Sequence, residues 1–176
     1  MKKFELTTEF ITNFLGIKLF RIKALVKFGD VKKGELGGFV EKEENLEHYG
    51  NAWVYGDAQV YGDAKVSGDA KVSGDAKVSG DAIVSGNAIV SGNAMVSGNQ
   101  MYATVKGFGS NYRDTTFFVT KDGNVCVNCG CFSGTLEQFR KKVKETHKDT
   151  EYAKEYLAIA DLMEMHFKEE LEKIKK

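Results

Sequence analysis

Residues 68–99 read GDAKVSGDAKVSGDAIVSGNAIVSGNAMVSGN, and this stretch decides the fold of the chain. Its unit is six residues long: Gly, Asp or Asn, Ala, a variable residue, Val and Ser. A glycine falls at every sixth position from Gly50 to Gly98. Ala and Val lie two positions apart, which is the period of a β-strand that turns alternate side chains to one face. Gly followed by Asp or Asn is typical of a turn, so each unit predicts a short strand and a corner.

A run of such units cannot form an α-helix, whose period is near 3.6 residues. It cannot form a stack of hairpins either, because no unit is long enough to pair back on itself. The remaining solution is a solenoid, in which each strand pairs with a strand one coil later. The repeat resembles the hexapeptide-repeat family. That resemblance implies a left-handed parallel β-helix with three hexads in each coil, which we place at residues 37–103.

With three hexads in a coil, residues 18 positions apart share a column on the outer wall. The variable position then forms the columns Trp53–Lys71–Ile89, Gln59–Lys77–Met95 and Lys65–Ile83–Met101. Each column ends in an apolar residue, so the last coil is expected to expose an apolar band. Such bands usually mark a contact.

We therefore expect the chain to associate with itself, and the hexapeptide resemblance favours a homotrimer first and a dimer second. Aromatic and Met side chains on a flat β wall bury a large area at small entropic cost. The predicted contact residues are Trp53, Tyr55, Tyr61, Ile83, Ile89, Met95 and Met101.

The rest of the chain predicts a cap and a second module, which makes the protein mainly β. Residues 1–36 are expected to form an N-terminal β cap, and residues 37–51 a degenerate first coil. In that coil His48 occupies the position that later hexads give to Val. Residues 104–176 predict a ββαα module, with residues 104–114 as a glycine-rich connector.

Local signals define the elements of this module. Two strands surround an Asp122-Gly123 turn, which is a strong hairpin signal. Thr135 and Gln138 form a capping box that begins the first helix. The second helix begins near Thr150 and carries a buried apolar face.

Composition excludes several classes of protein. Lys and Arg number 25 and Asp and Glu also number 25, so net charge does not indicate a nucleic-acid partner. No apolar run approaches the roughly 18 residues of a membrane span, and the start of the chain does not read as a signal peptide. Three cysteines within six residues do not form a secreted disulfide framework. We expect a cytoplasmic protein without a membrane partner.

Three segments extend the resemblance to the whole chain: GELGGFVEKEENL, GNAWVYGDAQVYG and CGCFSGTLEQF. They are similar to segments of hexapeptide-repeat proteins encoded by bacteriophages and prophages. The resemblance implies no particular activity. It does imply a phage setting, with the host bacterial cytoplasm as the location and host machinery or host defence as the target.

The hexapeptide family also includes coenzyme A-dependent acyltransferases, which use a His as general base. The repeats of this chain contain no His, and no inserted loop encloses a coenzyme A groove. We therefore expect no catalytic residues and no cofactor, and keep the acyltransferase as an alternative.

The CGCFSGT segment joins a strand to the start of a helix, where free backbone amides can bind an anion. Arg113 is well suited to phosphate. The predicted ligand site comprises Ser110, Arg113, Thr115, Gly130, Ser133, Gly134 and Thr135. A phosphate-bearing molecule or a nucleotide is its expected occupant, and the alternative is a tight turn with a helix cap.

Cys126, Cys129 and Cys131, together with His147, are the weak candidates for a zinc site. Strand alternation sends neighbouring side chains to opposite faces, so we expect no metal here.

Three functions follow from these observations. The first is a non-catalytic phage-type scaffold, an oligomeric β-helix that presents its C-terminal module to a host protein, for instance as an anti-CRISPR-like inhibitor. The second is a binder or sponge for a small anionic ligand. The third is the acyltransferase.

Overall fold

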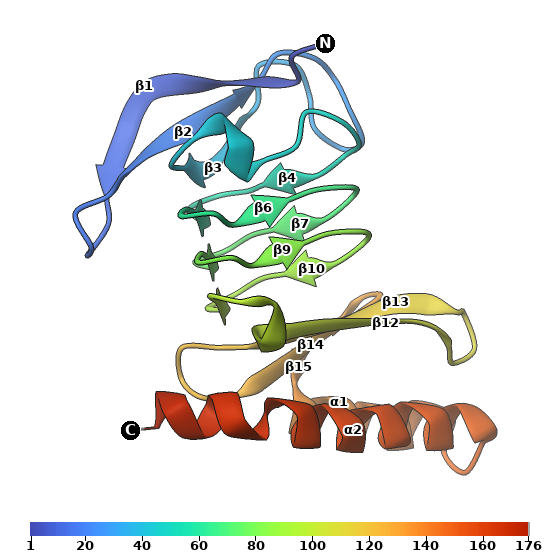
Figure 1. Ribbon diagram of the computed structural model, residues 1–176. Helices are drawn as coiled ribbons and strands as arrows, with labels where there is room; N and C mark the ends of the chain where they lie inside the picture. The colour runs from blue at the N-terminus through green and yellow to red at the C-terminus, as the bar shows by residue number, and fades with distance from the viewer. Residues whose placement is uncertain (176) are drawn as a thin grey trace. The chain divides into compact units, whose positions relative to one another are not determined.

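The structure, a computed structural model, describes residues 1–175. The chain forms two compact units, Met1–Asn99 and Gln100–Lys176 (Figure 1). The strands of the first unit are β1 (Phe4–Thr12), β2 (Lys18–Ala24), β3 (Leu36–Val40), β4 (Trp53–Val54), β5 (Gln59–Val60), β6 (Lys65–Val66), β7 (Lys71–Val72), β8 (Lys77–Val78), β9 (Ile83–Val84), β10 (Ile89–Val90) and β11 (Met95–Val96). A 3₁₀ turn, η1 (Glu43–Asn45), follows β3.

The hexads form a parallel β-solenoid of about three turns, as predicted. Its walls are the sheets β4–β7–β10, β5–β8–β11 and β6–β9, and the coils lie one below another in Figure 1. The register pairs Trp53 with Lys71 and Lys71 with Ile89, which confirms the spacing of 18 residues. Met101 is the exception, because the chain enters the 3₁₀ turn η2 (Asn99–Met101) and the Met101 side chain is buried.

The Ala and Val positions of the hexads form the solenoid core. Val54, Val72 and Val90 are each 0% exposed, and the Ala positions are equally buried. The strands are only two residues long, so backbone hydrogen bonds must run between coils. One example is the Tyr55 amide, which donates to the Val72 carbonyl at 2.8 Å.

Glycine is required at the corners for two separate reasons. The corner glycines from Gly50 to Gly92 all have positive φ, a conformation that other residues adopt only at a cost. At some corners the next coil also approaches closely. A Cβ atom on Gly80 would collide with the Ser97 carbonyl oxygen, whereas a Cβ on Gly56 would meet nothing within 4 Å.

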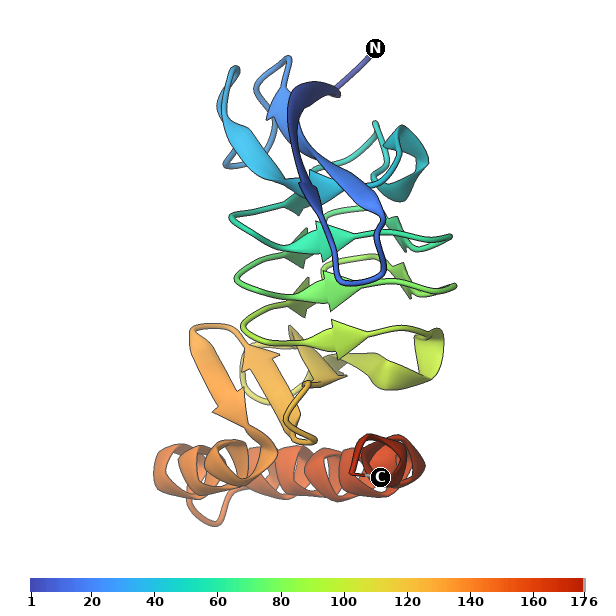
Figure 2. The same ribbon diagram turned by 90° about the vertical axis from the view of Figure 1, so that its left-hand side faces the viewer.

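The predicted N-terminal β cap joins the solenoid through one continuous sheet. Its order is β1-β2-β3-β5-β8-β11, antiparallel through β3 and parallel from β3 to β5. Figure 2 shows the β1–β2 hairpin lying along this wall. Leu19, Phe39 and Tyr61 form a buried cluster beneath the hairpin, with Ile11 and Ile17 packed against it.

This arrangement corrects two predicted contact residues. Tyr61 is only 7% exposed, and Trp53 is 0% exposed. The Trp53 ring contacts Phe4 and Phe28, with centroid distances of 6.2 and 5.3 Å. Trp53 and Tyr61 therefore belong to the core of the first unit, because the cap folds over the walls on which they lie.

The first coil is longer than the others, and this corrects the position of His48. Leu46 pairs with Val66, and Phe39 pairs with Gln59, so the offset is 20 residues rather than 18. Leu46, which is 1% exposed, takes the Val position that the sequence assigned to His48.

Lys3 closes the solenoid at this end. Its side chain is buried, and its ammonium group donates to the Ala52 carbonyl at 2.9 Å. The carbonyls of Tyr49 and Gly50 lie 3.5 Å away. Lys3 thus satisfies backbone acceptors of a corner that has no preceding coil to pair with.

The second unit is a four-stranded antiparallel sheet with both helices on one face (Figure 1). Its elements are β12 (Tyr102–Phe108), β13 (Arg113–Val119), β14 (Val125–Cys129), β15 (Phe132–Thr135), α1 (Leu136–His147) and α2 (Glu151–Ile174). The hairpin turn, the Thr135 capping box and the start of the second helix are confirmed. The prediction of two strands is incomplete, because β12 and β15 pair with the outer edges of that hairpin. Neither helix is long and apolar enough, over the described residues, to cross a membrane.

Gly56 and Gly80 offer a matched test of the corners, because both have φ of +61°. We expect Gly56→Ala to cost about 1–2 kcal/mol of unfolding free energy, from its left-handed backbone alone. Gly80→Ala should cost more, because the added methyl also meets the Ser97 carbonyl of the next coil. Chemical denaturation of the two variants measures the difference. Equal losses would contradict the close packing of the coils.

Burial lowers the pKa of Lys3 from 10.5 to about 8, against the opposing effect of the Glu47 and Asp69 carboxylates. Between these two pH values the unfolded chain binds a proton that the folded chain has released. The free energy of unfolding should therefore rise with pH across this window, by about 1.4 kcal/mol for each unit of the shift. Denaturation at pH 7.5, 9 and 10.5 tests this. Lys3→Met, the control, should remove this part of the rise, and a fall in wild type relative to the variant would contradict the assignment.

Candidate functional site

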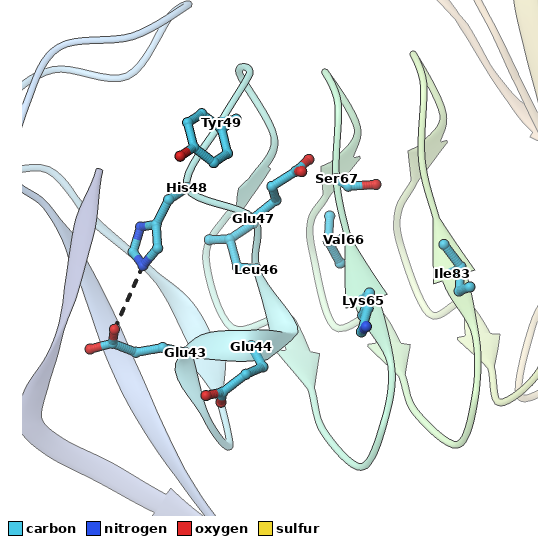
Figure 3. A pocket seen from close by; sticks show the side chains of 10 residues that line it. All are labelled: Glu43, Glu44, Leu46, Glu47, His48, Tyr49, Lys65, Val66, Ser67 and Ile83. Carbon is cyan, nitrogen blue, oxygen red and sulfur yellow. Dashed lines mark ion pairs between the residues drawn. The ribbon is translucent and has the colours of Figure 1, made fainter. Parts of the chain in front are cut away.

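The first unit carries a groove of about 570 Å³ on the wall formed by β6 and β9. The first coil forms one edge of this groove, from η1 to Tyr49. Figure 3 shows Glu43 and Glu44 extending from η1, with Lys65 and Ile83 on the neighbouring coils. The groove is lined by Glu43, Glu44, Leu46, Glu47, His48, Tyr49, Lys65, Val66, Ser67 and Ile83.

His48 lies at this groove but is poorly arranged to act as a general base. Its Nδ1 accepts a hydrogen bond from the Lys3 backbone amide at 3.2 Å. Its Nε2 therefore carries the proton of the neutral ring and lies 3.6 Å from a Glu43 carboxylate oxygen (Figure 3). The ring stacks on Phe4, with a centroid distance of 4.4 Å. Both nitrogens are engaged, so the imidazole has no free lone pair for a substrate.

Two of the three groove carboxylates are also held by the protein. Glu43 accepts a hydrogen bond from the Lys2 ammonium at 2.6 Å, which lowers the pKa of the Glu43 carboxyl. Glu47 accepts from the Gly68 amide at 3.2 Å. The acidic edge thus stabilises the first coil, and two of its three carboxylates are not free to act on a substrate.

The second unit contains a smaller pocket of about 250 Å³. It lies between the β12–β13 loop, the β14–β15 turn and the two helices. The lining residues are Ser110, Asn111, Arg113, Cys129, Cys131, Phe132, Phe139, Lys142, Val143, Thr146, His147 and Tyr156. Ser110 and Arg113 from the predicted ligand site thus lie in one pocket with Cys129, Cys131 and His147 from the predicted metal candidates.

Two cations line this pocket without an acidic partner. No Asp or Glu belongs to the lining. Among residues 1–175 neither the Arg113 guanidinium nor the Lys142 ammonium makes an ion pair. A Cβ atom on Gly130 would collide with Arg113 Nη1, so the absence of a side chain there lets the guanidinium lie against the turn.

The floor of the pocket is aromatic. Phe139 and Tyr156 are buried and meet edge to face, with a centroid distance of 5.7 Å and an interplanar angle of 86°. Phe132 lies 5.6 Å from Phe139, and His147 lies 5.6 Å from Tyr156. Phe132 and His147 are only half-buried, so their rings remain accessible.

A chain of hydrogen bonds satisfies the polar atoms behind this floor. The Thr115 hydroxyl donates to Cys129 Sγ at 3.2 Å, and the Cys129 thiol lies 4.0 Å from the Tyr156 hydroxyl. That hydroxyl donates to the Phe108 carbonyl at 3.5 Å. Burial, together with Cys129, raises the pKa of Tyr156 to about 12, so the phenol is protonated at neutral pH. Thr115 is buried among these hydrogen-bonded groups. Contrary to the prediction, it does not line the pocket.

The start of α1 does not join the pocket. The Thr135 hydroxyl accepts from the Gln138 amide at 3.2 Å, and the Thr135 amide donates to Gln138 Oε1 at 2.9 Å. Ser133, Gly134 and Thr135 belong to the edge strand β15 and to this cap. The capping box uses backbone amides that we expected to bind an anion. Ser133, Gly134 and Thr135 therefore do not form the predicted anion site, and they lie outside the pocket.

The cysteines divide between two places. Cys129 and Cys131 line the pocket, whereas Cys126 lies outside it. Burial and the nearby Asp122 carboxylate raise the pKa of the Cys126 thiol. Within residues 1–175, no three His, Cys, Asp or Glu side chains come close enough together to hold a metal ion.

Sequence reasoning missed the contribution of α1 to the pocket. Lys142, Val143, Thr146 and His147 follow Phe139 at intervals of three, four, seven and eight residues, which places all five on one helical face. This spacing could have predicted that the α1 residues share one face. The sequence could not predict that Arg113 lies beside that face, because this depends on how β13 packs in the folded unit.

Comparison with known proteins adds to the assignment of the first unit. A family model described as the YdcK β-solenoid repeat matches residues 76–92, in the middle of the repeats. No curated protein matches the chain. The match supports a repeat β-solenoid family for this part of the chain.

Proposed function

We propose that this protein is a non-catalytic binding protein whose C-terminal unit holds a small phosphate-bearing ligand. One observation carries the proposal. Arg113 and Lys142 line a pocket that contains no carboxylate, and neither has an ion pair among the described residues. Two like charges around one hollow repel each other, and an anion bound between them removes that repulsion.

The residue types fit phosphate. The planar guanidinium of Arg113 can donate two parallel hydrogen bonds to one phosphate group, and Lys142 adds a compact charge. Ser110 supplies a hydroxyl at the same opening. These groups are exposed, so an anion reaches them without opening the core.

The geometry favours binding over catalysis. Both ring nitrogens of His48 are engaged, which argues against the acyltransferase alternative. In the C-terminal pocket no hydrogen bond joins His147 to Cys129 or Cys131 within the described chain. A thiol nucleophile needs a base within hydrogen-bond reach.

The biological part of the proposal rests on resemblance. Similarity to proteins encoded by bacteriophages and prophages supports a role in the cytoplasm of an infected bacterium. A protein that sequesters a nucleotide signal there would act against host defence. Holding such a molecule without converting it requires a pocket rather than a catalytic centre.

Binding of pyrophosphate and of nucleoside monophosphates, measured by calorimetry, tests the pocket. Arg113→Ala should weaken binding by about 10- to 100-fold, because a charge-assisted hydrogen bond contributes about 1.5–3 kcal/mol. Lys142→Ala should weaken it by a smaller factor. The control is Lys141→Ala, since Lys141 precedes Lys142 on α1 but does not line the pocket. If wild type binds none of these anions, or if all three variants bind alike, the proposal is wrong.

A second candidate function is contact with another protein, and the exposure of Ile83 favours it. Ile83 is 45% exposed on the β6–β9 wall, beside the groove of the first unit. Ile89 and Tyr55 on the β4–β7–β10 wall and Met95 on the β5–β8–β11 wall are half-buried. We propose that the β6–β9 wall mediates self-association, as a trimer first and a dimer second, or contacts a host protein.

Ile83→Asp tests self-association, because a carboxylate buried without a partner in an interface costs several kcal/mol. Light scattering at micromolar concentration should give a multiple of 19.5 kDa for wild type and a smaller mass for the variant. Ile83 is exposed in the single chain, so thermal unfolding should show that the variant still folds. A wild-type monomer, or an unchanged mass in the variant, would contradict this candidate.

A further inference from the structure

We infer that the ligand of the C-terminal pocket is a single nucleotide, with a flat aromatic ring as well as a phosphate; this inference rests on the proposed function. The pocket has two chemically different parts. Arg113 and Lys142 are exposed, whereas the rings of Phe132 and His147 are half-buried beside the buried Phe139 and Tyr156. A free phosphate would use only the first part.

The aromatic part suits a planar ring. The accessible rings can stack on a nucleobase, and base–aromatic stacking tolerates any base because each has a π-face. Both hydroxyls behind the floor are already used, since Thr115 donates to Cys129 Sγ and Tyr156 donates to the Phe108 carbonyl. A sugar ring would bring several hydroxyl groups against this surface and find few partners, so burying it there would be unfavourable.

Asn111 adds a group that can recognise the edge of a base. It lies in the β12–β13 loop, where its Nδ2 donates to the Ser110 hydroxyl at 3.3 Å. One N–H and the Oδ1 atom remain available. A side-chain amide presents a donor and an acceptor side by side, which complements the edge of adenine.

The size of the pocket limits the ligand. Its volume of about 250 Å³ lies just below the range of roughly 300–1,000 Å³ that is usual for small-molecule sites. One nucleotide fills this volume, whereas one of the two nucleotides of a dinucleotide would remain in solvent. The class is therefore a nucleoside monophosphate or one nucleotide of a larger molecule.

A ligand series separates this inference from the proposed function. The probes are pyrophosphate, ribose 5-phosphate, adenosine, AMP and UMP, titrated into the full chain by calorimetry. We expect AMP to bind about 5- to 100-fold more tightly than ribose 5-phosphate, as stacking of one base predicts. Phe132→Leu should reduce this ratio, because it should weaken AMP binding more than ribose 5-phosphate binding. Arg113→Ala should weaken both phosphates.

Two further variants guard against an unfolded protein and test edge recognition. Phe132→Trp keeps a stacking surface and should retain the AMP preference, even if Phe132→Leu loosens the packing on Phe139. Asn111→Ala should reduce the ratio of AMP to UMP affinity.

Each outcome bears on one claim. Equal binding of AMP, ribose 5-phosphate and pyrophosphate overturns the nucleotide inference and leaves the anion site in place. Adenosine binding as tightly as AMP overturns the role of the two cations. No binding of any phosphate compound overturns the proposed function, and the inference with it.

Discussion

The backbone hydrogen bond between successive coils is the interaction on which the rest of the first unit depends. Each strand of the hexads is two residues long, so it has no partner within its own hexad and must pair with a strand one coil away. The Ser73 amide, for example, donates to the Val90 carbonyl at 3.0 Å. This pairing demands that every corner turn by the same amount, which glycine at positive φ permits. It also demands small inward side chains, because Ala and Val from all three walls share one narrow core.

The same constraint explains the N-terminal end. A first coil has no preceding coil, so its amides and carbonyls need other partners. Lys3 supplies an ammonium to the Ala52 carbonyl. At the 3₁₀ turn of the first coil, the Asn45 side-chain amide donates to the Gly62 and Ala64 carbonyls of the second coil at 3.1 and 2.8 Å. Phe4 of β1 and Phe28 of the β2–β3 connection then cover Trp53. Residues of this first coil, from η1 to Tyr49, line one side of the β6–β9 groove.

The second unit is held together by the packing of helices on a sheet, and its pocket lies where loops at the sheet edge approach a helix. A hairpin extended by two edge strands carries two helices on one face, and the helices bury their apolar sides against it. Loops at the sheet edge then bring Arg113 and Asn111 beside the polar end of the α1 face. The floor is well packed, because its rings meet edge to face and the Tyr156 hydroxyl is hydrogen-bonded. The rim remains exposed and cationic, and the proposed nucleotide site rests on this arrangement.

The sequence by itself determined the features that repeat or that act over a few residues. These are the solenoid, its 18-residue columns, the Asp122-Gly123 hairpin and the Thr135 capping box, because each depends on near neighbours or on strict periodicity. Only the tertiary structure decided which outward residues are exposed: Trp53 and Tyr61 are buried by a cap that lies outside the repeat pattern. It also decided that Leu46 rather than His48 enters the core, and that Arg113 and Lys142 share one pocket. These contacts join segments far apart in the chain, and packing between such segments leaves no periodic trace in the sequence.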